Sequence, residues 1–378
     1  MTYCSSIDVG LFLETNGTVR TCCSGHSLGN IRTESVADIF SSPKYIEIKA
    51  EIDAGRPHAT YCKTCVDMEA QSGHSTRDYY KNFATDGTRT IRQIDIRWSN
   101  VCNLSCRMCG PEYSSDWARR LNIPIENTRR DYYADVLATI EQNRDTIQQV
   151  DLLGGEPLMQ RQNEQLLELL PDNIAINVLT NLSIPLENNR IYQLLKTRNR
   201  VDWIISLDHI GDKLEYIRHN ADWNRIQLNI QLLQQDFPER RISIIPTYNI
   251  WNALDLRDIY DWADANNLHV NWQQIQGNDY SSLKGQGTNS YVLQSHGPEV
   301  IAAAIAEIDQ LGSRSDFLTN VKQRLTRITA QGNTEFLAWT ERTEQFMPPK
   351  YKFQELWPEL HSLINIKSLP WGPFDATV

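Results

Sequence analysis

The chain has 378 residues, and its 37 Lys and Arg against 47 Asp and Glu give a formal net charge of -10 at pH 7. This acidic balance opposes a general attraction to polyphosphates, so we expect no nucleic-acid partner. No apolar run reaches the length of about 18 to 20 residues that a membrane helix needs, and the first residues lack the basic and apolar regions of a signal peptide. We therefore expect a cytoplasmic protein with no membrane association, long enough for a large catalytic domain with one or two additions.

The N-terminal region combines a predicted hairpin with several cysteines. Residues 9–22 contain two short apolar segments around a turn at Thr15-Asn16-Gly17, which predicts a β-hairpin. Helical patterns follow at 36–40 and 45–54, and then comes the pair Cys62-Lys-Thr-Cys65. In a cytosolic chain such thiols stay reduced, which favours metal ligation over disulfides.

Five cysteines precede residue 70, and four of them make a plausible ligand set: Cys4, Cys22, Cys62 and Cys65. Four thiolates are enough to close one iron–sulfur cluster, but they also suit a structural zinc knuckle, so both interpretations stay open. Cys23 is expected to be a spare, because neighbouring residues of a strand point in opposite directions.

From about residue 91 the chain alternates short β-branched runs with longer amphipathic stretches, which predicts βα units and a parallel sheet. Strands are expected at 91–98, 149–153, 174–180, 201–207, 242–248 and 268–275. Helices are expected at 131–143, 160–170, 188–196, 223–234, 254–265 and 298–310. With right-handed crossovers, six such units form an α/β fold, a partial (β/α)6 TIM-like barrel.

The predicted domains are a small N-terminal α+β cluster-binding domain at 1–85, the partial barrel at 86–290 and a C-terminal helical or irregular extension at 291–378.

The first barrel strand leads into Cys102-Asn-Leu-Ser-Cys106-Arg-Met-Cys109. Three thiolates on one short loop bind three corners of a four-iron cluster and leave the fourth iron open to a ligand. A closed zinc site is the alternative, but zinc needs a fourth ligand and no His follows nearby. The strand–loop–helix setting favours the cluster.

This loop, together with Gly154-Gly155-Glu156-Pro157 after the second strand, resembles the radical S-adenosylmethionine (radical SAM) superfamily. The resemblance implies that S-adenosylmethionine binds the open iron of a 4Fe-4S cluster and is reductively cleaved to a 5'-deoxyadenosyl radical, which abstracts hydrogen from a substrate. The N-terminal cysteines resemble the twitch and SPASM modules, which implies a second, auxiliary 4Fe-4S cluster. In most such enzymes the module follows the barrel, whereas here it precedes it.

The resemblance also assigns roles to residues at the strand ends. Cys102, Cys106 and Cys109 are the catalytic cluster ligands, and Met108 lies against the adenine. The other predicted contacts of the cofactor are Gly154, Gly155, Glu156, Pro157, Thr180, Asn181, Ser206, Asp208 and Arg218. Among these, Glu156 accepts from the ammonium group, and Ser206 and Arg218 bind the carboxylate.

Three functions are compatible with these motifs. The first is modification of a peptide or protein, because auxiliary clusters often accompany peptide-modifying members; flavodoxin or ferredoxin would supply the electron. The second is the same chemistry on a sugar or other small metabolite. The third is a non-catalytic iron–sulfur electron carrier, against which the Gly-Gly-Glu-Pro motif, Ser206 and Arg218 argue, since a carrier needs no cofactor pocket.

Overall fold

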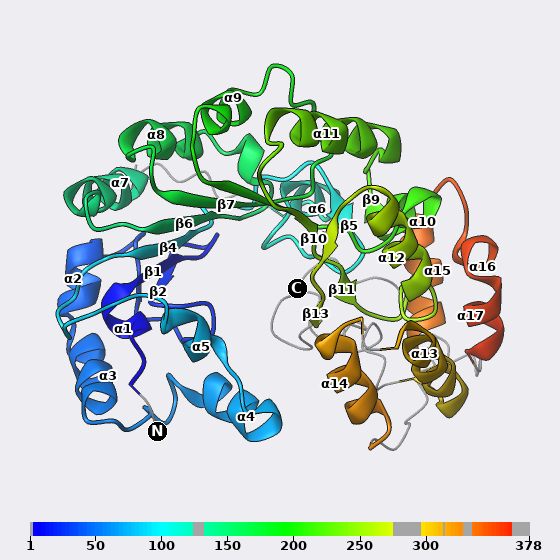
Figure 1. The fold of residues 1–378 in the computed structure, drawn as a ribbon, viewed down its shortest axis with the longest axis horizontal. Coiled ribbons are helices and arrows are strands. Elements are labelled where there is room, and N and C mark those ends of the chain that lie inside the picture. Colours follow the sequence, from blue (N-terminus) through cyan, green and yellow to red (C-terminus); the bar gives the residue numbers. More distant parts are fainter. Residues whose placement is uncertain (1–2, 124–131, 275–295, 313, 328–334, 365–378) are drawn as a thin grey trace. The chain divides into compact units, whose positions relative to one another are not determined.

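The computed structural model describes residues 3–123, 132–274, 296–312, 314–327 and 335–364 (Figure 1). The chain divides into two compact units. The first contains Met1–Val101, Glu126–Thr180 and Leu186–Trp203. The second contains Cys102–Ile125, Asn181–Pro185 and Ile204–Val378. The loop of three cysteines therefore begins where the chain first passes from one unit to the other.

The first unit is built on a sheet whose strands run in the order β7-β6-β4-β1-β2-β3. Its strands are β1 (Gly10–Leu13), β2 (Thr18–Arg20), β3 (Gly29–Asn30), β4 (Gln93–Ile96), β6 (Gln149–Leu152) and β7 (Ala175–Thr180). β4, β6 and β7 pair in parallel, as the βα pattern predicts. The α/β fold with a parallel sheet is confirmed.

The predicted N-terminal hairpin is present as the antiparallel pair β1 and β2. Its turn contains Gly17, whose φ of 82° is a conformation that glycine adopts readily. The sequence did not predict that β1 would also pair in parallel with β4, with Gly10 opposite Gln93. The hairpin thus extends the same sheet that the later strands build.

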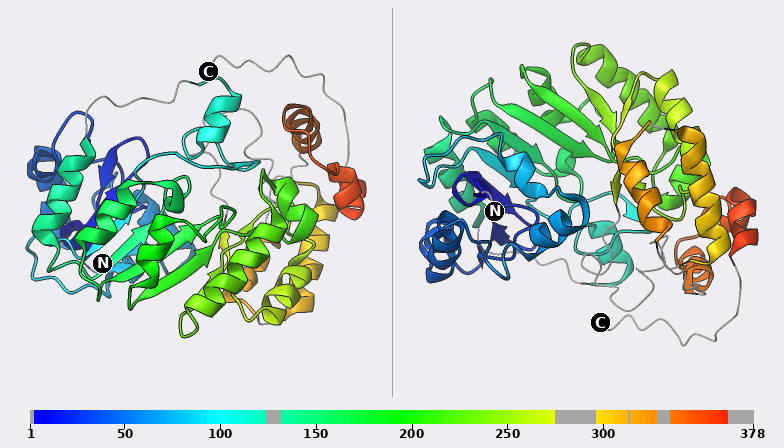
Figure 2. Two further views of the ribbon diagram at one scale, coloured as in Figure 1. Left: turned by 90° about the horizontal axis from the view of Figure 1, so that it is seen from above. Right: turned by 60° about the horizontal axis from the view of Figure 1, so that its bottom comes forward.

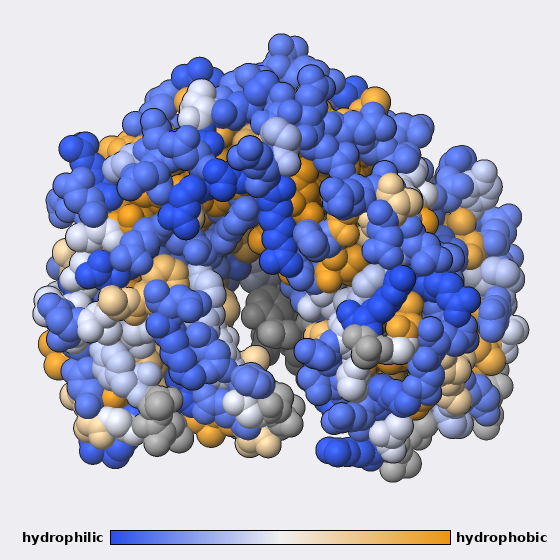
Figure 3. Space-filling view, viewed as in Figure 1, coloured by the Kyte–Doolittle hydropathy of each residue, from blue (hydrophilic) through white to orange (hydrophobic). Residues whose placement is uncertain are grey.

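Burial alternates along the sheet strands, and helices cover the apolar face. In β7, Ile176, Val178 and Thr180 are buried while the residues between them are partly exposed. The helices of this face are α7 (Tyr132–Asn143), α8 (Gln162–Leu169) and α9 (Arg190–Lys196), all at predicted positions. Figure 3 shows that the outward surface over α8 and α9 is largely hydrophilic, as expected for amphipathic helices.

Five short helices complete the N-terminal part of the first unit: α1 (Ser6–Val9), α2 (Val36–Ser41), α3 (Pro43–Asp53), α4 (Lys63–Ser72) and α5 (Thr76–Tyr80). The predicted helices at 36–40 and 45–54 correspond to α2 and α3. Capping boxes begin α2 at Ser35 and α5 at Ser75. The sequence analysis did not identify α4 and α5, which carry or follow the CxxC pair.

The second unit contains short strands and four helices from the barrel region. The strands are β5 (Ser105–Cys106), β9 (Arg218–His219), β10 (Ile242–Ile244), β11 (Thr247–Tyr248), β12 (His269–Val270) and β13 (Gln273–Gln274), and β8 (Val201–Ile205) contains the last point at which the chain passes from the first unit to the second. The helices are α6 (Ser115–Arg120), α10 (Gly211–Ile217), α11 (Trp223–Asp236) and α12 (Leu256–Ala265).

The two last predicted strands are each split in the structure. β10 pairs in parallel with β12, and β11 pairs in parallel with β13 as a separate two-stranded sheet. Pro246 lies between β10 and β11 and has no N–H to donate, so the strand pairing is interrupted there. The last residue of the predicted strand 268–275 lies outside the described residues.

The C-terminal helices are α13 (Pro298–Leu311), α14 (Asp316–Leu325), α15 (Glu335–Phe346), α16 (Phe353–Leu356) and α17 (Pro358–Leu363). The first of them is the predicted helix at 298–310. Figure 2 shows them, in yellow to red, as one group within the second unit. The aromatic tail from residue 365 lies outside the described residues. Among the helices that the structure describes, none is long and apolar enough to cross a membrane.

Candidate functional site

The three-cysteine loop is buried and compact. Cys102 and Cys106 are each 8 % exposed, and Cys109 packs against them together with Leu104. A backbone hydrogen bond of 2.9 Å from the N–H of Cys109 to the carbonyl of Cys106 closes the turn between the second and third cysteines. The structure therefore brings the three predicted ligands together in one cluster of side chains.

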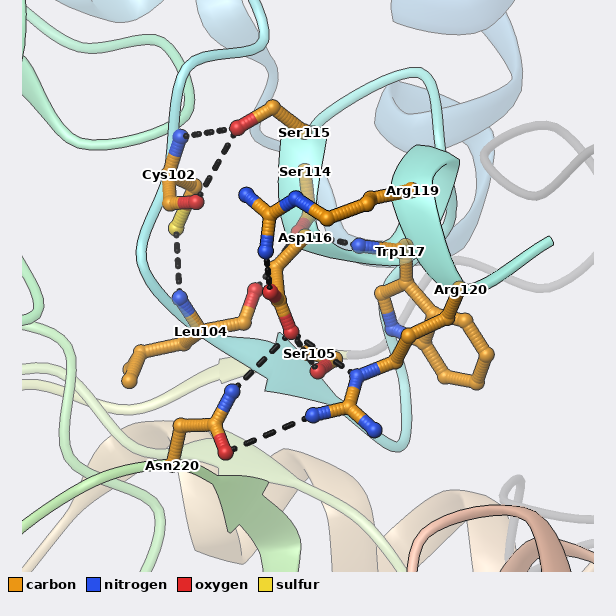
Figure 4. A network of polar contacts seen from close by, with 10 residues as sticks. All are labelled: Cys102, Leu104, Ser105, Ser114, Ser115, Asp116, Trp117, Arg119, Arg120 and Asn220. Atoms are coloured by element: carbon orange, nitrogen blue, oxygen red, sulfur yellow. Dashed lines mark hydrogen bonds and ion pairs between the residues drawn. The ribbon is translucent and has the colours of Figure 1, made fainter. Parts of the chain in front are cut away.

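The start of α6 holds this loop by contacts to its backbone (Figure 4). Ser115 Oγ accepts from the N–H of Cys102 at 3.1 Å and donates to the carbonyl oxygen of the same residue at 3.1 Å. Trp117 Nε1 donates to the carbonyl oxygen of Cys106 at 2.8 Å. Two of the three cysteines are thus fixed by side chains from the following helix.

Asp116 lies between these two contacts and forms the centre of a polar network (Figure 4). Its Oδ2 accepts from Ser105 Oγ at 2.6 Å, from Arg120 Nε at 2.9 Å and from Asn220 Nδ2 at 2.9 Å. Ser105 belongs to β5 and Asn220 follows β9, and these two strands pair antiparallel. Asp116 therefore binds side chains at both β5 and β9, the two strands in which Cys106 stands opposite Arg218.

Two side-chain N–H groups point at cysteine sulfurs. Arg218 Nη1 lies 3.8 Å from Cys106 Sγ, and Asn181 Nδ2 lies 3.7 Å from Cys102 Sγ. Arg218 also forms a 2.7 Å ion pair with the fully buried carboxylate of Asp208. Hydrogen bonds to the sulfurs are one of the factors that set the reduction potential of an iron–sulfur cluster. Three of the predicted cofactor residues are therefore located beside the loop.

Burial shifts the pKa values of the ionisable side chains at this site. Burial raises the pKa of Cys106 to about 12, against the opposing effect of the Arg218 charge, and it also raises the pKa of Cys109. Burial is the largest single influence on Arg218 and lowers its pKa, but attraction to Asp208, Cys106 and Cys109 together outweighs burial and raises the pKa of the guanidinium. Without a metal the thiols stay protonated at neutral pH, so metal binding must displace their protons.

The Gly-Gly-Glu-Pro motif packs against the chain that leads into the cysteine loop. Gly154 has a φ of 120°, and a Cβ there would lie 2.2 Å from Gln160 Nε2. A Cβ on Gly155 would lie 2.3 Å from the carbonyl oxygen of Val101, the residue before Cys102. Gly155 is therefore needed for a close approach of two backbone segments and Gly154 for its positive φ, not only for an approach to a ligand.

Glu156 is fully buried, and its carboxylate contacts protein groups. Oε1 accepts from Thr180 Oγ1 at 2.6 Å and from the N–H of Leu158 at 3.2 Å, which caps the 3-10 turn that begins at Pro157. Glu156 and Thr180, both predicted cofactor contacts, are therefore paired with each other. Their contacts with S-adenosylmethionine stay predictions.

Met108 and Ser206 complete the predicted cofactor set. Met108 is half-buried in the turn between the second and third cysteines, and Ser206 is half-buried directly after β8. Both positions are compatible with a ligand at the loop, and their contacts with the adenine and the carboxylate stay predictions.

The N-terminal cysteines also lie within electrostatic reach of one another. Burial raises the pKa of Cys22, and the thiols of Cys23, Cys4 and Cys65 raise it further. Burial raises the pKa of Cys62, to which Cys4 and Cys65 also contribute. Three segments of the first unit, which carry Cys4, Cys22 and the pair Cys62 and Cys65, thus bring the predicted auxiliary ligands into one neighbourhood.

Cys23 differs from its neighbour in exposure. Cys22 is 6 % exposed, whereas Cys23 is exposed and lies near Asp95 and Arg97. Our reason for treating Cys23 as a spare was wrong, because both residues lie in a turn after β2 and not in a strand. Its role as a spare stays a prediction.

The donor set of the loop, three cysteines that pack together, fits an iron–sulfur cluster. Among the described residues, no group of three or more His, Cys, Asp and Glu side chains is placed to hold one metal ion. In a four-iron cluster each thiolate binds a different iron, so the ligands need not converge on a single point. Three buried cysteines, with N–H groups directed at two of the sulfurs, suit a cluster that leaves one iron for another ligand.

The sequence analysis missed three residues that hold the loop: Arg107, Asp116 and Trp117. Arg107 lies inside the motif and is 1 % exposed. Asp116 stands in the first turn of a helix, where an acidic residue is favoured, but its partner Asn220 lies about a hundred residues away. Only the spatial arrangement reveals these roles.

Two family models match the chain. The model of the SPASM iron–sulfur cluster-binding domain matches residues 4–66, and that of the radical SAM superfamily matches residues 96–263. A curated relative, the GTP 3',8-cyclase of Syntrophomonas wolfei subsp. wolfei, is 28 % identical over 227 residues. That alignment covers 54 % of this chain and 65 % of the relative, so the chain spans somewhat less than two thirds of it.

Solved structures with a similar fold include native anSMEcpe with bound AdoMet and Kp18Cys peptide, at 16 % identity and a TM-score of 0.42, covering 63 % of each chain. Another is Streptococcus suis SuiB bound to S-adenosylmethionine, at 16 % identity and a TM-score of 0.42, covering 81 % of this chain and 65 % of the other.

The cluster loop, the motif after the second strand and the two family matches lead to the same conclusion. Residues 96–263 form a radical SAM superfamily domain and residues 4–66 form a SPASM-type iron–sulfur cluster-binding domain, and these domains imply S-adenosylmethionine, a 4Fe-4S cluster and auxiliary iron–sulfur clusters as cofactors.

Proposed function

We propose that this enzyme reductively cleaves S-adenosylmethionine and abstracts hydrogen from a peptide or protein, leading to a post-translational modification. The bound cluster and cofactor would supply the radical. Cys102, Cys106 and Cys109 would hold the cluster, and Arg218 and Asn181 would direct N–H groups at its sulfurs. Cys4, Cys22, Cys62 and Cys65 would hold one auxiliary 4Fe-4S cluster.

The observation that supports a polar substrate without phosphate groups is a row of amide and carboxylate side chains across the sheet of the first unit. Asp95, Asp151 and Asn177 stand opposite one another on β4, β6 and β7. The carboxylate of Asp151 accepts from Asn177 Nδ2 at 2.7 Å, from Gln149 Nε2 at 2.8 Å and from Gln93 Nε2 at 2.9 Å. Such groups can bind peptide N–H groups, carbonyls and amines.

The charge of this row opposes a polyphosphate substrate. Burial raises the pKa of Asp95 to about 7, and burial also raises the pKa of Asp151. Arg97 is already engaged in a 2.9 Å ion pair with Asp95. A triphosphate needs uncommitted cationic groups, and this row of carboxylates and amides contributes no cationic side chain of its own.

A sugar or other small metabolite is the second candidate, since the curated relative is a GTP 3',8-cyclase. The polar row also offers hydrogen bonds to sugar hydroxyls, so the two candidates share one binding chemistry. The electron donor would be a flavodoxin or ferredoxin, which a chemical reductant replaces in the assay below.

Isotope transfer distinguishes the candidates. Reduced, reconstituted enzyme is incubated with S-adenosylmethionine and extracts of cells grown in deuterated medium, separated into a protein and peptide fraction and a small-molecule fraction. Deuterium in the released 5'-deoxyadenosine identifies the fraction that contains the substrate, and Cys106→Ala is the control for non-enzymatic transfer. We expect transfer from the protein and peptide fraction. Transfer from the small-molecule fraction alone would replace this proposal by the second candidate.

A further inference from the structure

The C-terminal helix α15 is joined to the cysteine loop by a buried arginine. Arg107 lies between the second and third cysteines. Its Nε donates to the carbonyl oxygen of Tyr216 at 2.9 Å, its Nη1 donates to Thr343 Oγ1, and its Nη2 donates to the carbonyl oxygen of Met347 at 3.5 Å. The guanidinium carbon also lies 4.0 Å from the centroid of the Tyr216 ring. One loop side chain therefore reaches both α10 and the end of α15.

A second contact reaches the loop by a different path. The ring of Phe346, the last residue of α15, stacks on that of Trp117, with centroids 6.0 Å apart and planes inclined by 13°. Trp117 in turn donates to the carbonyl of Cys106. Both contacts converge on the same part of the loop, at its second cysteine.

A third contact joins α15 to α10, the helix that leads directly into Arg218. Glu344 Oε1 accepts from Tyr216 Oη at 2.9 Å and from the N–H of Phe353 at 2.6 Å. Tyr216 is in α10, which runs directly into β9, and the N–H of Arg107 donates to the carbonyl of Ile217 at 2.8 Å. Movement of α15 would therefore shift the cysteine loop and the β9 strand together.

We propose that α15 is a functional part of the radical SAM site, in which Arg107 and Trp117 are positioning residues that set the geometry of Cys106 and Cys109 and of the Arg218 N–H group directed at the sulfur of Cys106. The physical reason is that a short loop cannot fix three ligands by itself, while a buried guanidinium that loses an acceptor must rearrange. This inference concerns the cluster and its cofactor, and so goes beyond the substrate proposed above.

The test uses Thr343→Val, which removes the hydroxyl that accepts from Arg107 and keeps the shape of the side chain, and Arg107→Lys, which keeps the charge and loses the planar fork. Thr319→Val is the matched control, because the Thr319 hydroxyl also donates to a carbonyl of its own helix but lies exposed on α14. Each full-length variant is reconstituted anaerobically and reduced. Its electron paramagnetic resonance spectrum is recorded during a titration with S-adenosylmethionine, and its melting temperature is measured in parallel.

For Thr343→Val we expect a melting temperature near that of the control. The concentration of S-adenosylmethionine at which half of the spectral change occurs should rise about tenfold, because one charge-assisted hydrogen bond is lost. Arg107→Lys should alter the spectrum in the same direction. Wild-type spectra and titrations in both variants would overturn the proposal, as would a lower melting temperature with an unchanged spectrum, which indicates a purely structural contact. No substrate is present in these measurements, so they do not depend on whether the substrate is a peptide.

Discussion

The Arg218–Asp208 pair is expected to contribute both to the stability of the fold and to the binding of S-adenosylmethionine, and the two contributions can be measured separately. The two side chains are 12 % and 0 % exposed and lie 2.7 Å apart. In Arg218→Ala the carboxylate of Asp208 loses its cationic partner in a buried position, which costs about 3–5 kcal/mol of unfolding free energy. The same variant loses the N–H group at the sulfur of Cys106, so cofactor binding should weaken by about 1.5–3 kcal/mol.

The double variant with Asp208→Asn separates these two effects. The amide keeps an oxygen that accepts from the N–H of Thr247, as Asp208 Oδ1 does at 3.0 Å, but it carries no charge. Anaerobic urea titrations should therefore recover most of the lost stability, whereas calorimetry should still show weak binding of S-adenosylmethionine. A loss below about 1 kcal/mol in Arg218→Ala, or no recovery in the double variant, would refute the assignment of a buried, mutually dependent pair.

Three further variants test the rest of the molecule. Cys106→Ala should abolish 5'-deoxyadenosine release while the protein still folds, and release at the wild-type rate would exclude this loop as the catalytic site. Replacing Cys62 and Cys65 by Ala should lower the iron content from about eight to about four atoms, and zinc in the anaerobically purified protein would favour a structural knuckle instead. The pKa of Asp95 is about 7 in the folded state, above its value of about 4 in the unfolded chain, so the folded protein holds this proton between about pH 4 and 7. The free energy of unfolding should therefore fall as the pH rises through this window. In Asp95→Asn the melting temperature should depend less on pH between about pH 5 and 8.

The sequence predicted the elements whose signals are local. Short apolar, β-branched runs between longer amphipathic stretches identified all six barrel strands, because a buried strand needs such residues along its own length. The split of the strand at 242–248 depends on Pro246, a signal that was present in the sequence but was not used. α4 and α5 were not predicted, although α5 begins with a local signal, the capping box of Ser75 and Asp78.

In the candidate site, too, the residues with local sequence signals were predicted and those held by long-range contacts were not. The three loop cysteines were predicted because their spacing within one loop is itself the signal. Arg107 and Thr343 are more than two hundred positions apart in the chain. Neither residue has a local sequence signal from which their hydrogen bond could be predicted. Glu156 was assigned to the cofactor by resemblance, while its contacts with Thr180 and Leu158 show a capping role that sequence patterns did not distinguish.

The parallel pairing of β1 with β4 also bears on how this chain folds and how it could be divided. β4 is hydrogen-bonded on one side to β6 and on the other to β1, so within the first unit it is an interior strand. A fragment that began near residue 86 would leave one side of β4 as a bare edge, and such edges recruit strands from other molecules. During synthesis, β1 leaves the ribosome long before β4 and must wait for it, so the N-terminal module and the catalytic sheet complete their folding as one cooperative unit.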